Sequence, residues 1–169
     1  MSRIIIPTPA ISGVNDLNVS GTHDYVAQSF TWRSDYKLNI IRYYAYATFH
    51  EHPTVRIYND NAGVPGTLKS NIGNMTPETT MGIVEKSGLN ITLTNGVLYW
   101  LELKVGNSVG EYVTQGTNIT LGVASDDSQY SGTLLMQASS THVWATTGRD
   151  LNFQLIGDND SPLLTCLKT

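Results

Sequence analysis

The sequence is short of several features that would mark other classes of protein. It has a single cysteine, Cys166, among 169 residues, which excludes an internal disulfide framework. Charged residues make up only 14% of the chain and the net charge is -4, whereas phosphate binding requires a clustered basic excess. We therefore expect no nucleic acid among its partners. Because no stretch approaches the roughly 20 apolar residues of a membrane helix, we expect no membrane anchor.

The N-terminal residues MSRIIIPTPAISG contain three isoleucines followed by two prolines. This apolar run is shorter than the roughly 7–15 residues of a signal-peptide core, so no export signal is visible. Proline favours an extended backbone here, and we predict an extended N-terminal arm over residues 1–20. The arm's candidate docking residues, which would add an edge strand to a neighbouring protein, are Arg3, Ile4, Ile5 and Ile6. The alternative is an ordinary first strand of the chain's own sheet.

Helical periodicity is almost absent, since no window of about 11 residues repeats apolar residues at helical spacing. Short alternating runs bounded by turn residues occur instead and predict strands. These runs are Val26–Thr31, Lys37–Phe49, Thr54–Asn59, Thr80–Ser87, Leu89–Leu93, Val97–Val105, Ile119–Val123, Gly132–Ala138 and Leu151–Ile156. Strands at this spacing predict an all-β fold, an antiparallel sandwich or barrel. The chain length fits one domain.

Charged residues indicate which side of each strand faces outward, because a charged side chain rarely enters a core. Strand side chains alternate, so residues two positions from an outward charge also point outward. Three strands treated in this way give the candidate outward residues Arg42, Tyr44, Tyr46, Arg56, Tyr58 and Trp100. Aromatic residues and arginine favour protein interfaces and sugar platforms. The alternative is that a loop or the N-terminal segment covers these rings.

The loop in VRIYNDNAGVPGTL, residues 55–68, raises the question of a cation site. Asn59, Asp60 and Asn61 supply oxygen atoms, but calcium takes about 6–8 oxygen ligands and the loop has one carboxylate. The GVPG stretch supplies turn chemistry, with positive φ at glycine and a fixed φ at proline. We predict a structural turn and no bound metal.

Several segments together carry a resemblance. VAQSFTW (Val26–Trp32), a long alternating strand, VRIYNDNAGVPGTL, LTNGVLYWLEL (Leu93–Leu103) and VWATTGRDLNFQL (Val143–Leu155) follow one another in this order. This order resembles the jelly-roll domains of bacterial choice-of-anchor surface proteins, which are similar to carbohydrate-binding modules. The resemblance implies an antiparallel jelly-roll β-sandwich, which we assign to residues 21–169. It implies an architecture rather than an activity.

The residues that could support catalysis form weak patterns. His50 and His52 share metal-like spacing on one strand, but a zinc site needs further ligands, for which only His23 and His142 remain. The carboxylate pairs in turn-like surroundings, which a glycosidase could use, are Asp126, Asp127, Asp158 and Asp160. We expect a protein that is not an enzyme and binds no cofactor.

The expected function follows from these features. A β-sandwich without a signal sequence and with few charges looks like a bacteriophage virion component. We expect a capsid cement or decoration protein, a homotrimer that contacts the major capsid protein or another virion protein. Its location would be the virion, assembled in the host cytoplasm. The alternative is a carbohydrate-binding or receptor-binding module of the tail-fibre type, with a glycan as its ligand.

Overall fold

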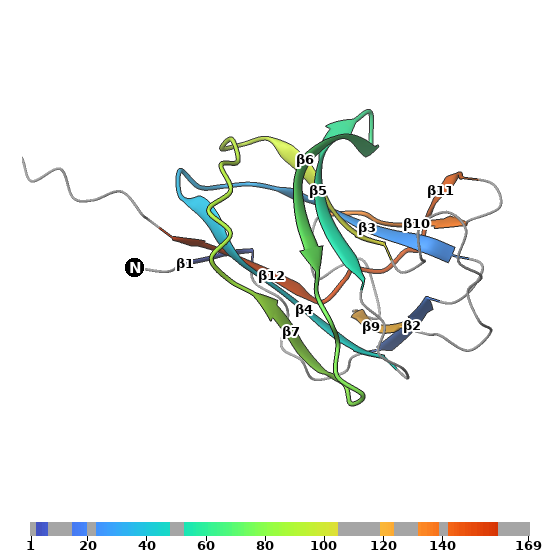
Figure 1. The fold of residues 1–169 in the computed structure, drawn as a ribbon. Helices are drawn as coiled ribbons and strands as arrows, with labels where there is room; N and C mark the ends of the chain where they lie inside the picture. Colours follow the sequence, from blue (N-terminus) through green and yellow to red (C-terminus); the bar gives the residue numbers. More distant parts are fainter. Residues whose placement is uncertain are drawn as a thin grey trace, which may run out of the picture.

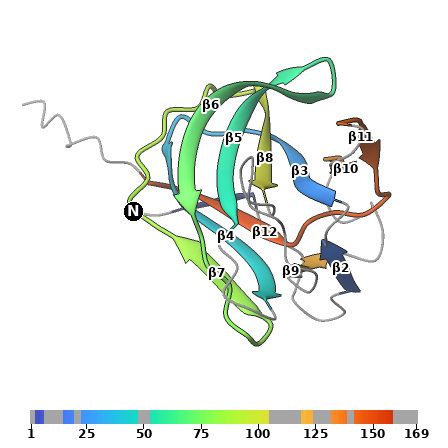
Figure 2. The ribbon, with the colours of Figure 1, turned by 45° about the vertical axis from the view of Figure 1, so that its right-hand side comes forward.

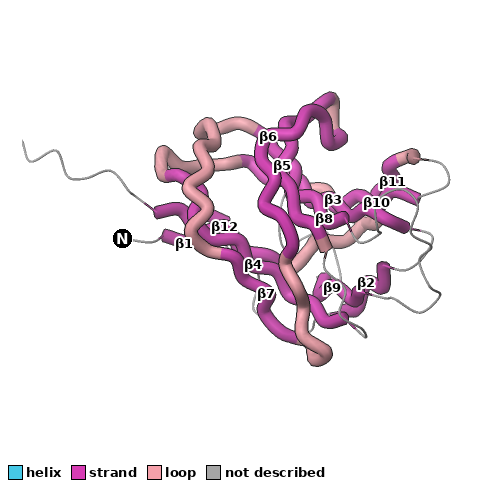
Figure 3. The backbone as a smooth tube through the Cα atoms, viewed as in Figure 1, coloured by secondary structure: helices cyan, strands magenta, loops and turns pink. Residues whose placement is uncertain are grey.

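The computed structural model describes residues 3–6, 15–19, 23–47, 53–104, 119–123, 132–138 and 142–158. In this part of the chain every regular element is a strand (Figure 3), and no helix is present that could cross a membrane. The strands are β1 (Arg3–Ile6), β2 (Asn15–Val19), β3 (His23–Thr31), β4 (Lys37–Ala47), β5 (Thr54–Asn61), β6 (Val64–Asn74), β7 (Gly82–Lys86), β8 (Leu98–Lys104), β9 (Ile119–Val123), β10 (Leu134–Ala138), β11 (Trp144–Thr146) and β12 (Phe153–Asp158).

The strands form two antiparallel sheets that lie one above the other (Figure 1). Sheet A has the order β1-β12-β4-β9-β2, and β7 also pairs with β4. Sheet B has the order β11-β10-β3-β8-β5-β6, and its β5–β6 hairpin bends away from the other strands at the top of Figure 2. The expected all-β, antiparallel sandwich is confirmed at this level.

The core lies between the two sheets and follows the expected alternation. On β4, Tyr43 and Ala45 are buried, whereas Arg42 and Tyr44 between and beside them are partly exposed. Leu101 of β8 and further side chains of β3, β5 and β12 pack against this inner face of β4. The predicted inward and outward sides of β4, β5 and β8 are therefore confirmed for the described residues. Thr48, Phe49 and Val105 lie outside them.

One buried polar contact joins two sheet elements that are distant in sequence. Gln28 of β3 is fully buried, and its Nε2 donates to Oδ1 of Asp150 at 3.2 Å. Its Oε1 accepts a hydrogen bond from the backbone N–H of Leu151 at 2.8 Å. Because buried polar groups need partners, this contact fixes the chain that enters β12 against β3.

One strand prediction is wrong, and the strands β6 and β11 were not predicted. Residues 89–93 make only one isolated bridge, between Ile91 and Leu38, although Leu93 is buried. Their alternation reflects burial against the core rather than a strand. No sequence pattern indicated β6, because an edge strand with turn residues and irregular register, as it shows against β5, needs no apolar alternation. The three-residue β11 is too short to produce a pattern.

The N-terminal segment pairs within the chain. β1 pairs with β12, with Arg3 opposite Gly157, and β2 pairs with β9. Residues Arg3–Ile6 therefore form the structure expected under the alternative interpretation, an ordinary strand at the edge of the chain's own sheet. The rest of the predicted arm, residues 1–2, 7–14 and 20, lies outside the described residues.

Candidate functional site

The structure divides the six predicted outward residues between two faces. Arg42, Tyr44 and Tyr46 lie on the outer side of sheet A, whereas the other three lie on the outer side of sheet B. Each sheet turns its inner side to the shared core, so the two outer faces lie on opposite sides of the sandwich. They cannot form one site.

The first surface, the β4 face, is formed by strands β7, β4 and β12. Its members are Arg42, Tyr44, Tyr46, Ile83, Glu85 and Gln154. Strand register places Ile83 directly opposite Tyr44, and its side chain is 57% exposed. The Arg42 guanidinium forms an ion pair with Glu85 through Nε and donates from Nη1 to Oε1 of Gln154 at 3.4 Å. The one cation of the face is thus balanced by its neighbour.

A shallow hollow lies in the β4 face. It holds only about 30 Å³, opens to solvent, and is lined by Arg42, Tyr43, Tyr44, Ile83, Asn152, Phe153 and Gln154. Ligand pockets for drug-sized molecules typically have volumes of about 300–1,000 Å³. The hollow is therefore a shallow surface depression and not a ligand pocket.

The second surface, the β8 face, is formed by strands β11, β3, β8 and β5. Its members are Tyr25, Arg56, Tyr58, Trp100, Glu102, Lys104 and Trp144. The rings of Tyr25 and Trp144 meet edge to face with their centroids 6.4 Å apart. Lys104 Nζ lies 5.6 Å from the centroid of the Tyr25 ring, which is within cation–π range.

The indole of Trp100 points outward from sheet B, yet it is buried. Its exposed fraction is 1%, and it belongs to a small cluster with Ala27 and Leu135, against which Tyr58, Val64 and Trp144 pack. Its Nε1 donates to Oδ1 of Asp60 at 2.8 Å. The expectation that Trp100 offers an exposed platform is therefore wrong, and the alternative, a covering loop, applies to this ring.

The covering loop is the Asn59–Gly66 segment. The backbone N–H of Gly63 donates to Oδ1 of Asp60 at 3.1 Å, and Gly63 has a φ of 87°, which glycine adopts without strain. A Cβ at Gly66 would lie 2.7 Å from the Cβ of Asn61. The single carboxylate of the loop, Asp60, thus accepts hydrogen bonds from the Gly63 backbone and from the Trp100 indole. Both bonds stabilise the turn.

A charged group is buried in the middle of the β8 face. Glu102 is 4% exposed, and its Oε1 has no hydrogen-bond partner. The nearest cation, Arg56 Nη1, lies 3.7 Å from Oε1. Burial raises the pKa of Glu102, while the Arg56 charge, a hydrogen bond with Tyr58 and the Lys104 charge act in the opposite direction.

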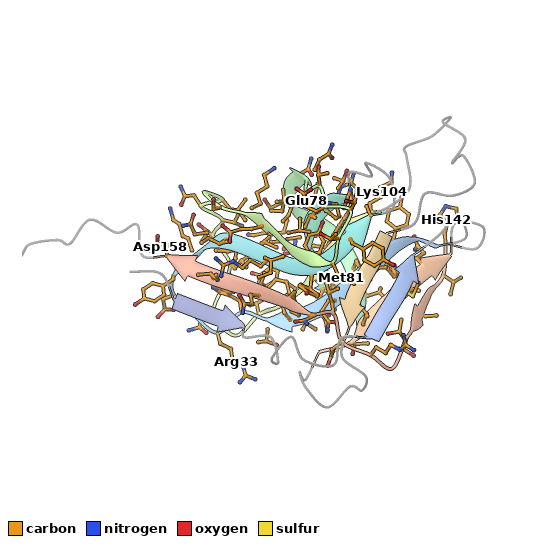
Figure 4. All side chains as sticks on the ribbon, turned by 90° about the horizontal axis from the view of Figure 1, so that it is seen from below. Arg33, Glu78, Met81, Lys104, His142 and Asp158 are labelled. Carbon is orange, nitrogen blue, oxygen red and sulfur yellow. The ribbon has the colours of Figure 1, made fainter. Side chains whose placement is uncertain are left out.

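Among the residues considered for catalysis, those that the structure describes do not form a site. Asp158 accepts a hydrogen bond from Nδ2 of Asn39 at 3.4 Å, and it lies at the opposite end of the molecule from His142 (Figure 4). No group of three or more His, Cys, Asp or Glu side chains gathers anywhere in the part of the chain that the structure describes. Asp126, Asp127 and Asp160 lie outside the described residues, as do His50 and His52 and Cys166.

Several members of the two faces were not singled out from the sequence. Ile83 and Gln154 belong to the β4 face, and Tyr25 and Trp144 belong to the β8 face. Nothing in the sequence indicated that β12 and β7 flank β4. Trp144 stands on a strand that the sequence pattern could not detect.

The resemblance motifs are explained by these contacts. Gln28 of VAQSFTW bonds to Asp150 and Leu151 of VWATTGRDLNFQL, and Asp60 of the GVPG loop bonds to Trp100 of LTNGVLYWLEL. The motif residues thus stabilise the fold. No family model matches the chain, and no curated protein sequence matches it.

Proposed function

We propose that this chain is a non-enzymatic virion structural protein, a capsid cement or decoration protein of the jelly-roll type. It docks on a neighbouring capsid protein with its β4 face. The observation that carries this proposal is the hollow beside Ile83, whose side chain is 57% exposed although it is apolar. An exposed isoleucine at a hollow flanked by Tyr44 and Arg42 has the composition of an interface centre.

The electrostatics of the β4 face agree with this role. Arg42 is paired with Glu85 and also bonded to Gln154, so an incoming protein would not have to desolvate an unpaired charge. Burying an unpaired charge is costly, whereas burying Ile83 and the ring of Tyr44 is favourable. An apolar side chain of the partner would pack over the hollow and against Ile83.

The experiment is made on particles of the virus that encodes the chain. We expect the chain in purified virions at a fixed copy number, measured by quantitative mass spectrometry. Particles that lack it should lose their contents at a lower temperature, because cement proteins bridge capsid subunits. Purified virions without the chain would refute the proposal. We further propose a homotrimer, which light scattering on a size-exclusion column would show as three chain masses.

A second candidate function is a carbohydrate-binding or receptor-binding module of the tail-fibre type. The observation in its favour is the group of partly exposed rings on the β8 face, Tyr25, Tyr58 and Trp144. An array of immobilised oligosaccharides tests it without any assumption about particles.

A further inference from the structure

The β8 face has a place in the proposed assembly. The two outer faces lie on opposite sides of the sandwich. A chain that docks by its β4 face therefore presents its β8 face away from the docking partner. This orientation rests on the proposed function, but the chemistry of the β8 face does not depend on it.

Strand register arranges the β8 face in cross-strand rows. In one row Trp144, Tyr25 and Lys104 follow one another, with Gln137 between the two rings. In another row Trp100 lies beside Tyr58. Four residues of β8 separate these rows, which corresponds to about 14 Å at a rise of about 3.4 Å per residue.

Between the aromatic rows lies a charged row. Its members are Glu102 of β8 and Arg56 of β5, which are directly opposite each other, and Ala27 of β3 on the other side of Glu102. Arg56 and Glu102 compensate each other's charge at 3.7 Å. The β8 face therefore offers hydrogen-bond donors and acceptors without a cluster of one sign.

Glu102 shows that the hydrogen bonding of this row is incomplete. Its Oε1 has no hydrogen-bond partner, although the residue is 4% exposed. A buried acceptor without a donor is costly, so a hydroxyl group supplied from outside would be favourable here. The side chains of Arg56 and Tyr58 beside Glu102 are both partly exposed, so they are available to a ligand at the same place.

We infer that the β8 face binds a neutral oligosaccharide. The rings of Tyr25, Tyr58 and Trp144 stack on the apolar faces of the sugar rings, whereas Arg56, Glu102 and Lys104 bond to hydroxyl groups. The distance between the aromatic rows exceeds one sugar ring, so a short oligosaccharide is bound and a monosaccharide is not bound measurably. Trp100 supports the surface from below beside Tyr58, its cross-strand neighbour.

The test uses the full chain on an array of immobilised hexose and N-acetylhexosamine oligosaccharides, followed by titration calorimetry with the strongest ligand. We expect Trp144→Ala and Tyr58→Ala each to weaken binding by about tenfold or more, since loss of an aromatic contact of about 1.4 kcal/mol corresponds to that factor. Tyr44→Ala, on the opposite face, is the matched control and should leave the affinity unchanged. Thermal unfolding of every variant confirms that it folds.

Because Trp144 meets Tyr25 edge to face, its removal could also shift that ring. Tyr25→Ala is the second variant on the same aromatic row, and Glu102→Gln tests the hydrogen-bonding row with little change in shape. A wild-type chain that binds no oligosaccharide overturns the inference and leaves the docking proposal in place. Binding that Tyr44→Ala abolishes, while Tyr25→Ala and Tyr58→Ala retain it, overturns the site and moves the ligand to the β4 face. Loss of particle association alone would refute only the docking proposal.

Discussion

Replacing Gln28 by methionine should be one of the most damaging conservative changes in this chain. The side chain is fully buried and makes two bonds that cross the sequence, to Asp150 Oδ1 at 3.2 Å and from the Leu151 N–H at 2.8 Å. Methionine has a similar shape, so it should leave little cavity, but it can make neither bond. The change therefore isolates the contribution of hydrogen bonding.

The expected loss can be worked out from these two bonds. A neutral hydrogen bond contributes about 0.5–1.5 kcal/mol and one to a charged group about 1.5–3 kcal/mol. The bond from Leu151 belongs to the first kind and the bond to Asp150 to the second. We expect Gln28→Met to lower the free energy of unfolding by about 3 kcal/mol, a large part of the 5–15 kcal/mol typical of a domain.

Urea unfolding followed by tryptophan fluorescence measures this loss. The matched control is Gln154→Met, the same substitution on the partly exposed side of β12, where the amide accepts a long bond from Arg42 at 3.4 Å. We expect the control to cost less than about 1 kcal/mol. Equal losses in the two variants would show that Gln28 does not hold β3 to the chain entering β12. A loss below about 1 kcal/mol for Gln28→Met, with an unchanged dependence of the unfolding free energy on urea concentration, would show the same.

Further predictions concern the covering loop and the buried acid. Asp60→Ala should destabilise the fold by about 1–2 kcal/mol, because it removes the acceptor of Trp100 Nε1, whereas Asn61→Ala on the same exposed turn should change the urea midpoint little. Millimolar calcium should leave the melting temperature of the wild-type chain unchanged, since Asp60 is already engaged by Trp100 and Gly63; a clear rise would mean that the loop binds the ion. Glu102→Gln should be more stable than the wild type at pH 7, with the difference shrinking on acidification. Because the pKa of Glu102 is raised, the folded chain holds the carboxyl proton more tightly than the unfolded chain does. The stability that this proton contributes is therefore lost as the pH rises above the usual pKa of 4.5. Melting curves at several pH values would refute this if the difference in melting temperature between the two proteins widened towards acid.

The sequence predicted the fold class well because period-2 alternation and the positions of charges are local signals. Arg42 and Arg56 each indicated correctly which side of their strand faces outward, and the alternate residues of each strand belong to the core. The same reasoning also placed Trp100 on the outer side of β8. Its error was to treat an outward direction as exposure, because a sequence pattern does not reveal a hairpin that bends over the sheet.

The candidate sites were less predictable, because they depend on strand order. Tyr44 and Tyr58 looked equivalent as outward tyrosines, yet their strands belong to different sheets. Ile83 is a neighbour of Tyr44 only through the pairing of β4 with β7. Trp144 meets Tyr25 only because β10 pairs with both β3 and β11. Such contacts between distant segments have no local signature in one sequence.

Cosedimentation of the purified chain with particles of its virus tests the docking function most directly. Wild-type protein should bind saturably to particles stripped of it, with a fixed number of copies per particle. Ile83→Asp places a charge in the exposed centre of the β4 face and should abolish binding, whereas Val143→Asp, at an equally exposed valine preceding β11, should not. Equal sedimentation of the two variants, or none by the wild type, would contradict the account.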